Sequence, residues 1–185
     1  ITQPEMFGLV RGVVTLRGKA NPKDFEYFRV QYGQGLNPTR WVQIGSDSPT
    51  PVTSGTLAAW DTQGLDGLYS VQLVVVYAEG QVTTDAVQVT VDNAPPRVRV
   101  VLPQPGTPAG VAAGDLLVIE ADVFDELGVR RVEFFVDGQR AGVVETAPYS
   151  VRWPARAGEH TLLVRATDTA GNVGESGSVR VVIGG

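Results

Sequence analysis

The stretch VTVDNAPPRVRVV, Val89–Val101, places two adjacent prolines between two runs in which apolar residues alternate with polar ones. Alternation with a period of two is typical of a β-strand that buries one face. Pro95 and Pro96 each fix their own φ, and Pro96 also holds Pro95 in an extended conformation. The stretch therefore predicts two strands joined by a short, stiff linker at Asp92–Pro96, and it divides the sequence into two halves that can be compared.

The two halves repeat one another. Gly67–Gly80 aligns with Gly158–Gly171 at a constant offset of 91, and the glycines at both ends match. After one extra residue, Val87–Val91 aligns with Val179–Ile183. Such self-similarity at a fixed distance indicates tandem copies of one structural unit. We expect two related domains on the two sides of the prolines.

Short alternating segments separated by Gly, Pro, Asn and Asp recur along the chain, whereas helical periodicity is hard to find. In the second half, Asp137 and Gly138 predict a two-residue hairpin turn. The strands predicted for that half are Leu116–Asp122, Val129–Val136, Pro148–Trp153, His160–Asp168 and Val179–Ile183. About seven strands in about 90 residues is the spacing of a β-sandwich. The fold class predicted is all-β, with one sandwich in residues 1–93 and another in residues 97–185.

Composition narrows the classes of function. The 185 residues are 43% hydrophobic and 19% charged, as in a globular protein with a core. The absence of cysteine excludes disulfides, zinc–thiolate sites and cysteine nucleophiles. The net charge is −5 and neither half has a basic excess, so nucleic acid is not an expected partner. The longest apolar run, Leu73–Ala78, is far shorter than the roughly 20 residues of a membrane span, so none is expected.

Several segments resemble bacterial immunoglobulin-like modules. In the second half these are Glu120–Gly128, Val132–Gly138, Ala147–Tyr149 and Arg165–Asn172, and in the first half Phe25–Gly35 and Leu57–Asp61 resemble a companion module. The resemblance implies two tandem immunoglobulin-like or fibronectin-III-like β-sandwiches joined by the short Pro-Pro linker. It also implies an extracytoplasmic appendage, as found at the C-terminal ends of penicillin-binding peptidoglycan synthases and in other surface proteins. No segment matches the catalytic motifs of a synthase.

The function expected on this basis is a non-catalytic spacer or protein-interaction module of a larger bacterial cell-envelope or secreted protein. Its partners would be other domains of the parent chain, an envelope protein or cell-wall glycan. The alternative is a glycan- or peptidoglycan-binding accessory module of a cell-wall enzyme. Because the sequence begins at Ile1 and shows no signal peptide, we expect it to be a piece of a longer chain.

Acidic side chains are predicted to gather at one end of the second sandwich, where two of its loops and its first strand meet. The candidate calcium ligands are Asp92, Asn93, Asp122, Asp125 and Asp168, with Glu126 and Asn172 nearby in sequence. Calcium takes six to eight oxygen ligands, which these loops can offer. The alternative is that these residues stabilise turns through hydrogen bonds to the backbone. No other cofactor is expected.

Two aromatic positions match across the repeat. Trp60 falls near Trp153, which favours a core role for both, and the sole histidine, His160, aligns with Tyr69. A Ser-His-Asp triad would have to use His160, whose alignment with a tyrosine indicates a structural residue instead. We therefore expect no catalytic residue and no enzyme activity.

Two further hypotheses concern surface residues. Trp41 follows a Gly- and Pro-containing loop and, with Tyr32, is either an exposed platform for glycan or a side chain packed beneath that loop. Carboxylates such as Glu133 are expected to be solvated on a sandwich face rather than to act in glycosidase chemistry.

Overall fold

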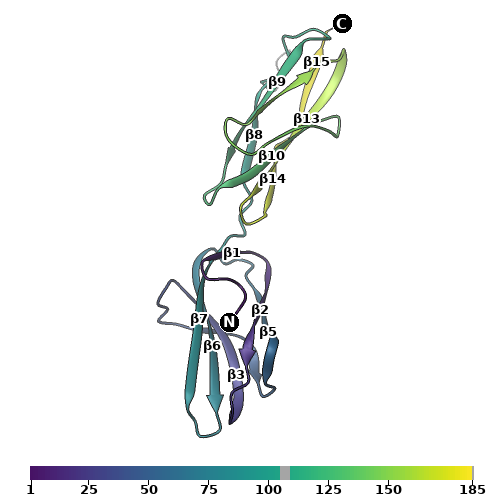
Figure 1. Ribbon diagram of the computed structural model, residues 1–185. Helices are drawn as coiled ribbons and strands as arrows, with labels where there is room; N and C mark the ends of the chain where they lie inside the picture. The colour runs from purple at the N-terminus through teal and green to yellow at the C-terminus, as the bar shows by residue number, and fades with distance from the viewer. Residues whose placement is uncertain (105–108, 185) are drawn as a thin grey trace. The chain divides into compact units, whose positions relative to one another are not determined.

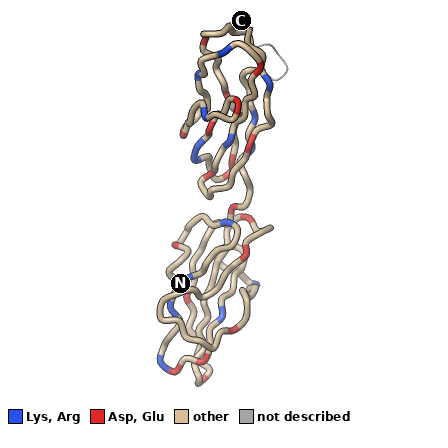
Figure 2. Tube along the Cα trace, turned by 90° about the vertical axis from the view of Figure 1, so that its right-hand side faces the viewer, with Lys and Arg blue, Asp and Glu red and all other residues tan. Residues whose placement is uncertain are grey.

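The computed structural model describes residues 1–104 and 109–184, and Figure 1 shows its strands. The chain divides into two compact units, a first unit of Ile1–Asn93 and a second unit of Ala94–Gly185. Every regular element in the described residues is a β-strand, which confirms the all-β prediction. No helix in that part of the chain has the length and apolar character needed to cross a membrane. Lys and Arg are interspersed with Asp and Glu along each unit (Figure 2).

The first unit is a sandwich of two sheets. Its strands are β1 (Gly8–Val10), β2 (Val13–Ala20), β3 (Phe25–Gln34), β4 (Val42–Ser48), β5 (Val52–Asp61), β6 (Gly67–Tyr77) and β7 (Val82–Val91). One sheet has the order β1-β7-β6-β3-β4 and the other consists of β2 and β5. The short strand β1 pairs with the end of β7 in parallel, from Gly8 opposite Val89 to Val10 opposite Val91. The other neighbouring strands are antiparallel.

Alternation along the strands builds the core of the first unit. Val71, Leu73 and Val75 of β6 are all buried, as are Phe28 and Val30 of β3. Residues two apart lie on the same face of a strand, so one face of each strand is apolar. The core of this unit consists of first-unit residues alone.

The second unit is also a two-sheet sandwich. Its strands are β8 (Arg97–Leu102), β9 (Leu116–Phe124), β10 (Val129–Val136), β11 (Gln139–Val144), β12 (Ser150–Pro154), β13 (Gly158–Asp168), β14 (Val173–Glu175) and β15 (Val179–Ile183). One sheet has the order β11-β10-β13-β14, with β15 also paired to β13, and the other has the order β12-β9-β8. Its core surrounds Phe134 and is built from second-unit residues.

The predicted turn between β10 and β11 is present. Asp137 and Gly138 both have positive φ, 50° and 76°, and Val136 faces Gln139 across the turn. Two consecutive residues of positive φ define the type I′ turn that suits the twist of a hairpin. The strands predicted for this half all lie close to observed strands, and the structure adds bounds for β11 and β14, which the sequence analysis does not give.

The repeat in the sequence has a structural counterpart. β6 and β13 begin at the aligned glycines Gly67 and Gly158, and both strands contain 11 residues. In the first unit the rings of Trp60 and Tyr69 meet edge to face with centroids 6.0 Å apart. In the second unit Trp153 and His160, the aligned residues, meet edge to face at 4.9 Å. His160 therefore takes the structural place of a tyrosine.

Each side of the connection between the units is attached to its own unit. The side-chain amide of Asn93 accepts a hydrogen bond from the Gly12 N–H at 2.8 Å and donates to the carbonyl oxygens of Thr62 at 2.8 Å and Leu65 at 3.1 Å. On the other side, Pro96 is buried against the backbone of Gly174. Ala94 and Pro95 alone lie between these two anchors.

Candidate functional site

The carboxylate of Asp168, at the end of β13, closes the turn that follows this strand. Its Oδ1 accepts hydrogen bonds from the N–H groups of Gly171 at 2.6 Å and Asn172 at 2.8 Å. Its Oδ2 accepts one from the side-chain amide of Asn172 at 2.8 Å. Asp168 is fully buried, and a buried carboxylate needs such donors to offset its lost hydration. These bonds give Asp168 the turn-stabilising role that was one of its two predicted roles.

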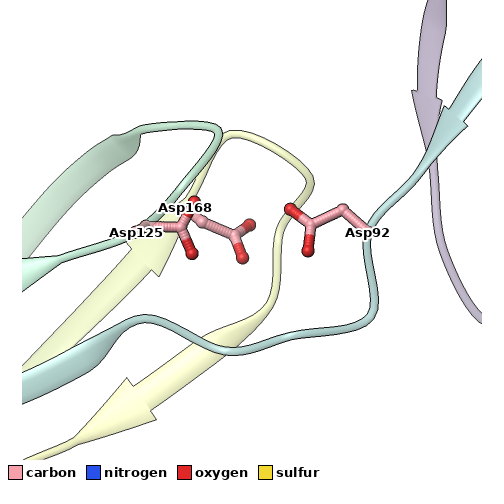
Figure 3. Close-up of side chains that lie close together, drawn as sticks. All are labelled: Asp92, Asp125 and Asp168. Carbon is pink, nitrogen blue, oxygen red and sulfur yellow. The ribbon is translucent and has the colours of Figure 1, made fainter. Parts of the chain in front are cut away.

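Asp125 has a similar role in the loop between β9 and β10. Its Oδ1 accepts hydrogen bonds from the N–H groups of Leu127 at 2.9 Å and Gly128 at 3.0 Å, which forms an Asx turn. A carboxylate oxygen of Asp125 lies within 4.8 Å of one of Asp168 (Figure 3). Two carboxylates at this separation repel one another unless hydrogen-bond donors or a cation offset their charge. The backbone and amide donors to both side chains supply part of that compensation.

The other three predicted ligands each make contacts of their own. Asp92, which Figure 3 also draws, belongs to the first unit, where it follows β7 and its N–H donates to the Val10 carbonyl oxygen at 3.0 Å. Asn93 uses its amide for the first-unit bonds described above. Asp122 is exposed on β9 and forms an ion pair with Arg99 at 3.3 Å. Within the second unit, the structure thus brings Asp125 and Asp168 together and pairs Asp122 with an arginine.

Tyr32 is half-buried and packs against the core of the first unit. Its ring centroid lies 5.1 Å from that of Trp60 and 6.0 Å from that of Tyr69. Trp41 is half-buried just before β4. Tyr32 shares the inward face of β3 with Phe28 and Val30, so it is not a fully exposed partner for Trp41, and glycan binding stays a prediction.

His160 lies between two hydrogen-bond acceptors. Its Nδ1 is 2.6 Å from Oδ2 of Asp137, and its Nε2 is 2.9 Å from the carbonyl oxygen of Arg156. The hydrogen bond to Asp137 raises the pKa of His160 above its usual 6.5, although burial opposes the shift. The same bond lowers the pKa of Asp137 below 3.8. Since both ring nitrogens are occupied, His160 is poorly placed to act as a base toward a nucleophile.

The burial of Glu133 contradicts the prediction that its carboxylate is solvated. We expected it to be solvated, but it is 8% exposed. Its carboxylate lies 3.6 Å from the guanidinium of Arg131 and 3.4 Å from that of Arg140. The long arginine side chains of β10 and β11 cover the carboxylate and neutralise it, which is how an acidic residue becomes buried on an outer sheet face.

The sequence reasoning missed Asp137 as a functional partner of His160. The available signal was the hairpin turn itself, because β10 and β13 pair antiparallel and Val136 faces Leu162. A residue that follows Val136 must then lie close to the start of β13. Oδ1 of Asp137 accepts a hydrogen bond from the Thr161 N–H at 2.8 Å, which fixes the carboxylate beside the histidine.

Comparison with known proteins bears on the fold. Residues 96–164 match the bacterial Ig domain family. The sequence has no significant match among curated proteins. The structure is similar to fibronectin(III)-like modules of Clostridium thermocellum CbhA, with 22% identity, coverage of 100% of this chain and 93% of that chain, and a TM-score of 0.54.

Two further solved structures are similar at lower identity. Domains from titin share 16% identity, with coverage of 97% of this chain and 62% of that chain and a TM-score of 0.50. A 1.5-MDa bacterial ice-binding adhesin shares 17%, with coverage of 96% and 60% and a TM-score of 0.45. The family match and the CbhA modules confirm the immunoglobulin-like or fibronectin-III-like character that was predicted. At these identities the likeness concerns the fold alone.

Proposed function

We propose that this chain is a non-catalytic spacer or protein-interaction module of a larger extracytoplasmic bacterial protein. The match of residues 96–164 to the bacterial Ig domain supports the bacterial, extracytoplasmic setting. The observation that carries the spacer role is the connection between the units. Asn93 is bonded to the first unit, Pro96 is packed in the second, and only Ala94 and Pro95 lie between them. A short connection that contains proline is less flexible than a Gly/Ser linker. Such a connection suits a spacer between other parts of the parent protein.

The chemistry of the second unit is consistent with this role. Its single histidine, its buried Asp168 and its buried Glu133 are all engaged in bonds that hold loops or sheet faces in place. With Tyr32 half-buried against the core, the glycan-binding alternative is supported by Trp41 and by the suspected parent protein. The attachment to a penicillin-binding synthase remains a prediction from the sequence resemblance.

A distance measurement between the units tests the spacer role. The chain has no cysteine, so spin labels can be attached only at introduced sites such as Thr53→Cys and Val182→Cys, both exposed. We expect a narrow distribution of distances in the otherwise native chain. Insertion of a Gly/Ser segment after Ala94 should broaden it, because such segments behave as flexible coils. A native distribution as broad as that of the insertion variant would refute the spacer proposal.

Calcium binding remains a prediction. A substitution at Asp168 can distinguish calcium binding from stabilisation of the turn. An asparagine at 168 would direct its amide N–H group at the amide of Asn172, so two donors would meet. We expect Asp168→Asn to destabilise the second unit by about 1–3 kcal/mol, by the same amount in calcium and in chelator. Thermal unfolding under both conditions measures this. If chelator lowers the unfolding midpoint of the unsubstituted chain and not that of the variant, calcium binds there.

A further inference from the structure

The two ring nitrogens of His160 face acceptors only. Asp137 presents a carboxylate oxygen to Nδ1, and Arg156 presents its backbone carbonyl oxygen to Nε2. A neutral imidazole carries one N–H group and can donate to one of them, whereas the imidazolium carries two and can donate to both. Both acceptors therefore receive a hydrogen bond from His160 only when the ring is protonated.

The acceptors come from different parts of the second unit. Asp137 lies in the turn between β10 and β11, which belong to the same sheet as β13. Arg156 lies in the loop that leads from β12, in the other sheet, to β13. His160 thus joins a hairpin turn of one sheet to the loop that crosses between the two sheets. The Trp153 and His160 rings pack edge to face, and the side chain of His160 is 11% exposed.

We propose that Asp137, His160 and Arg156 form a proton-operated latch, in which the His160 imidazolium ties the hairpin turn to the crossing loop and deprotonation releases one of the two ties. The latch is a property of the second unit. In the first unit the aligned residue is Tyr69, which has a phenol in place of the imidazole.

The charges around the ring favour the protonated form. The carboxylate of Asp137 is the nearest, and its other oxygen is held by the Thr161 N–H at 2.8 Å, so it cannot turn away. The guanidinium of Arg156 opposes protonation. Glu159, next to His160 in the strand, is paired with Arg180 of β15 at 3.3 Å, and these two charges offset one another. The bond with Asp137 is the largest contribution and it raises the pKa of His160.

The direction of the pH dependence follows from these shifts. The pKa of His160 is raised above 6.5 in the folded unit, so its stabilising contribution is complete below pH 6.5 and is lost as the pH rises through the folded value. The pKa of Asp137 is lowered, so its contribution is present above 3.8 and is lost as the pH falls through its folded value. The latch is therefore strongest between these limits, in mildly acidic solution.

Nuclear magnetic resonance of the full chain tests the latch directly, because His160 gives the only histidine ring signals. We expect the ring nitrogens to titrate with a midpoint above 6.5 and the Arg156 carbonyl carbon signal to shift with the same midpoint. In Asp137→Asn the new amide can accept from Thr161 and donate to Nδ1, and the neutral ring then satisfies both neighbours. The midpoint should fall below that of the unsubstituted chain, while the Asn-Gly turn keeps its conformation.

Thermal unfolding supplies the second readout. The second unit should become less stable between pH 6 and pH 9, and His160→Tyr, which copies Tyr69, should remove that dependence. The latch is refuted by a histidine midpoint at or below 6.5, by a midpoint that Asp137→Asn leaves unchanged, or by the same pH dependence in His160→Tyr.

Discussion

Replacing Gly174 by alanine should strongly destabilise the second unit. A Cβ atom built at Gly174 would lie 1.9 Å from the carbonyl oxygen of Pro96, a distance that no real contact reaches. The obstacle is backbone, so it cannot rotate away as a side chain could. Either β14 must leave its place beside β13 or Pro96 must leave its anchor. Overpacking commonly costs 1–3 kcal/mol, and we expect a loss of about 3 kcal/mol or more here.

Denaturant unfolding followed by circular dichroism measures this loss. Gly177→Ala is the matched control, since it lies in the same part of the chain and nothing occupies the space within 4 Å of its added Cβ. That variant should unfold like the unsubstituted chain. In the labelled protein described above, Gly174→Ala should also broaden the distance distribution if Pro96 loses its anchor. The prediction would be contradicted if Gly174→Ala and the unsubstituted chain unfolded at the same denaturant concentration, because the backbone would then accommodate the Cβ without loss of stability.

Replacing Trp60 by alanine should remove a large part of the stability of the first unit. Trp60 is 1% exposed and contacts the rings of Tyr32 and Tyr69. Truncation of a buried tryptophan costs about 3–5 kcal/mol through lost contacts and the cavity that remains. A unit of this length has a total stability on the order of 5–14 kcal/mol. Thermal and denaturant unfolding should show an early first-unit transition.

Trp60→Phe separates the contribution of the ring from that of the indole N–H. Nε1 of Trp60 is buried and makes no hydrogen bond within the described residues. A phenyl ring keeps much of the aromatic contact and removes a donor that gains nothing from burial, so its cost should be much smaller. Trp41→Ala, at a half-buried position, should also cost less than Trp60→Ala. Equal losses in all three variants would contradict the core role of Trp60.

The strands could be predicted from the sequence where apolar and polar residues alternate. The same alternation also predicts which face of the strand each side chain occupies. Phe28, Val30 and Tyr32 are two residues apart in β3, so parity alone places Tyr32 on the core face. The glycan hypothesis instead placed Tyr32 on an exposed surface together with Trp41. Glu133 shows the limit of the same rule. Parity places it on the outer face, but its burial depends on Arg140, which arrives from a neighbouring strand.

The contacts that define the candidate sites involve residues far apart in the sequence. The three partners of the Asn93 amide are Gly12, Thr62 and Leu65, which no local pattern associates with it. The acidic residues were predicted from their places in loops at one end of the second sandwich. The turn bonds of Asp125 and Asp168 follow from the tendency of Asp to accept from nearby N–H groups. The pairing of His160 with Asp137 required the register of β10 and β13.

The parallel pairing of β1 with β7 has a mechanical consequence. The chain enters the first unit ahead of β1 and leaves it after β7, and these strands run in the same direction at Gly8–Val10 and Val89–Val91. A tensile force applied along the polypeptide would pull the two strands in opposite directions along their length. Their backbone bonds would then bear the load together, in shear, rather than opening one after another as in a peeled hairpin.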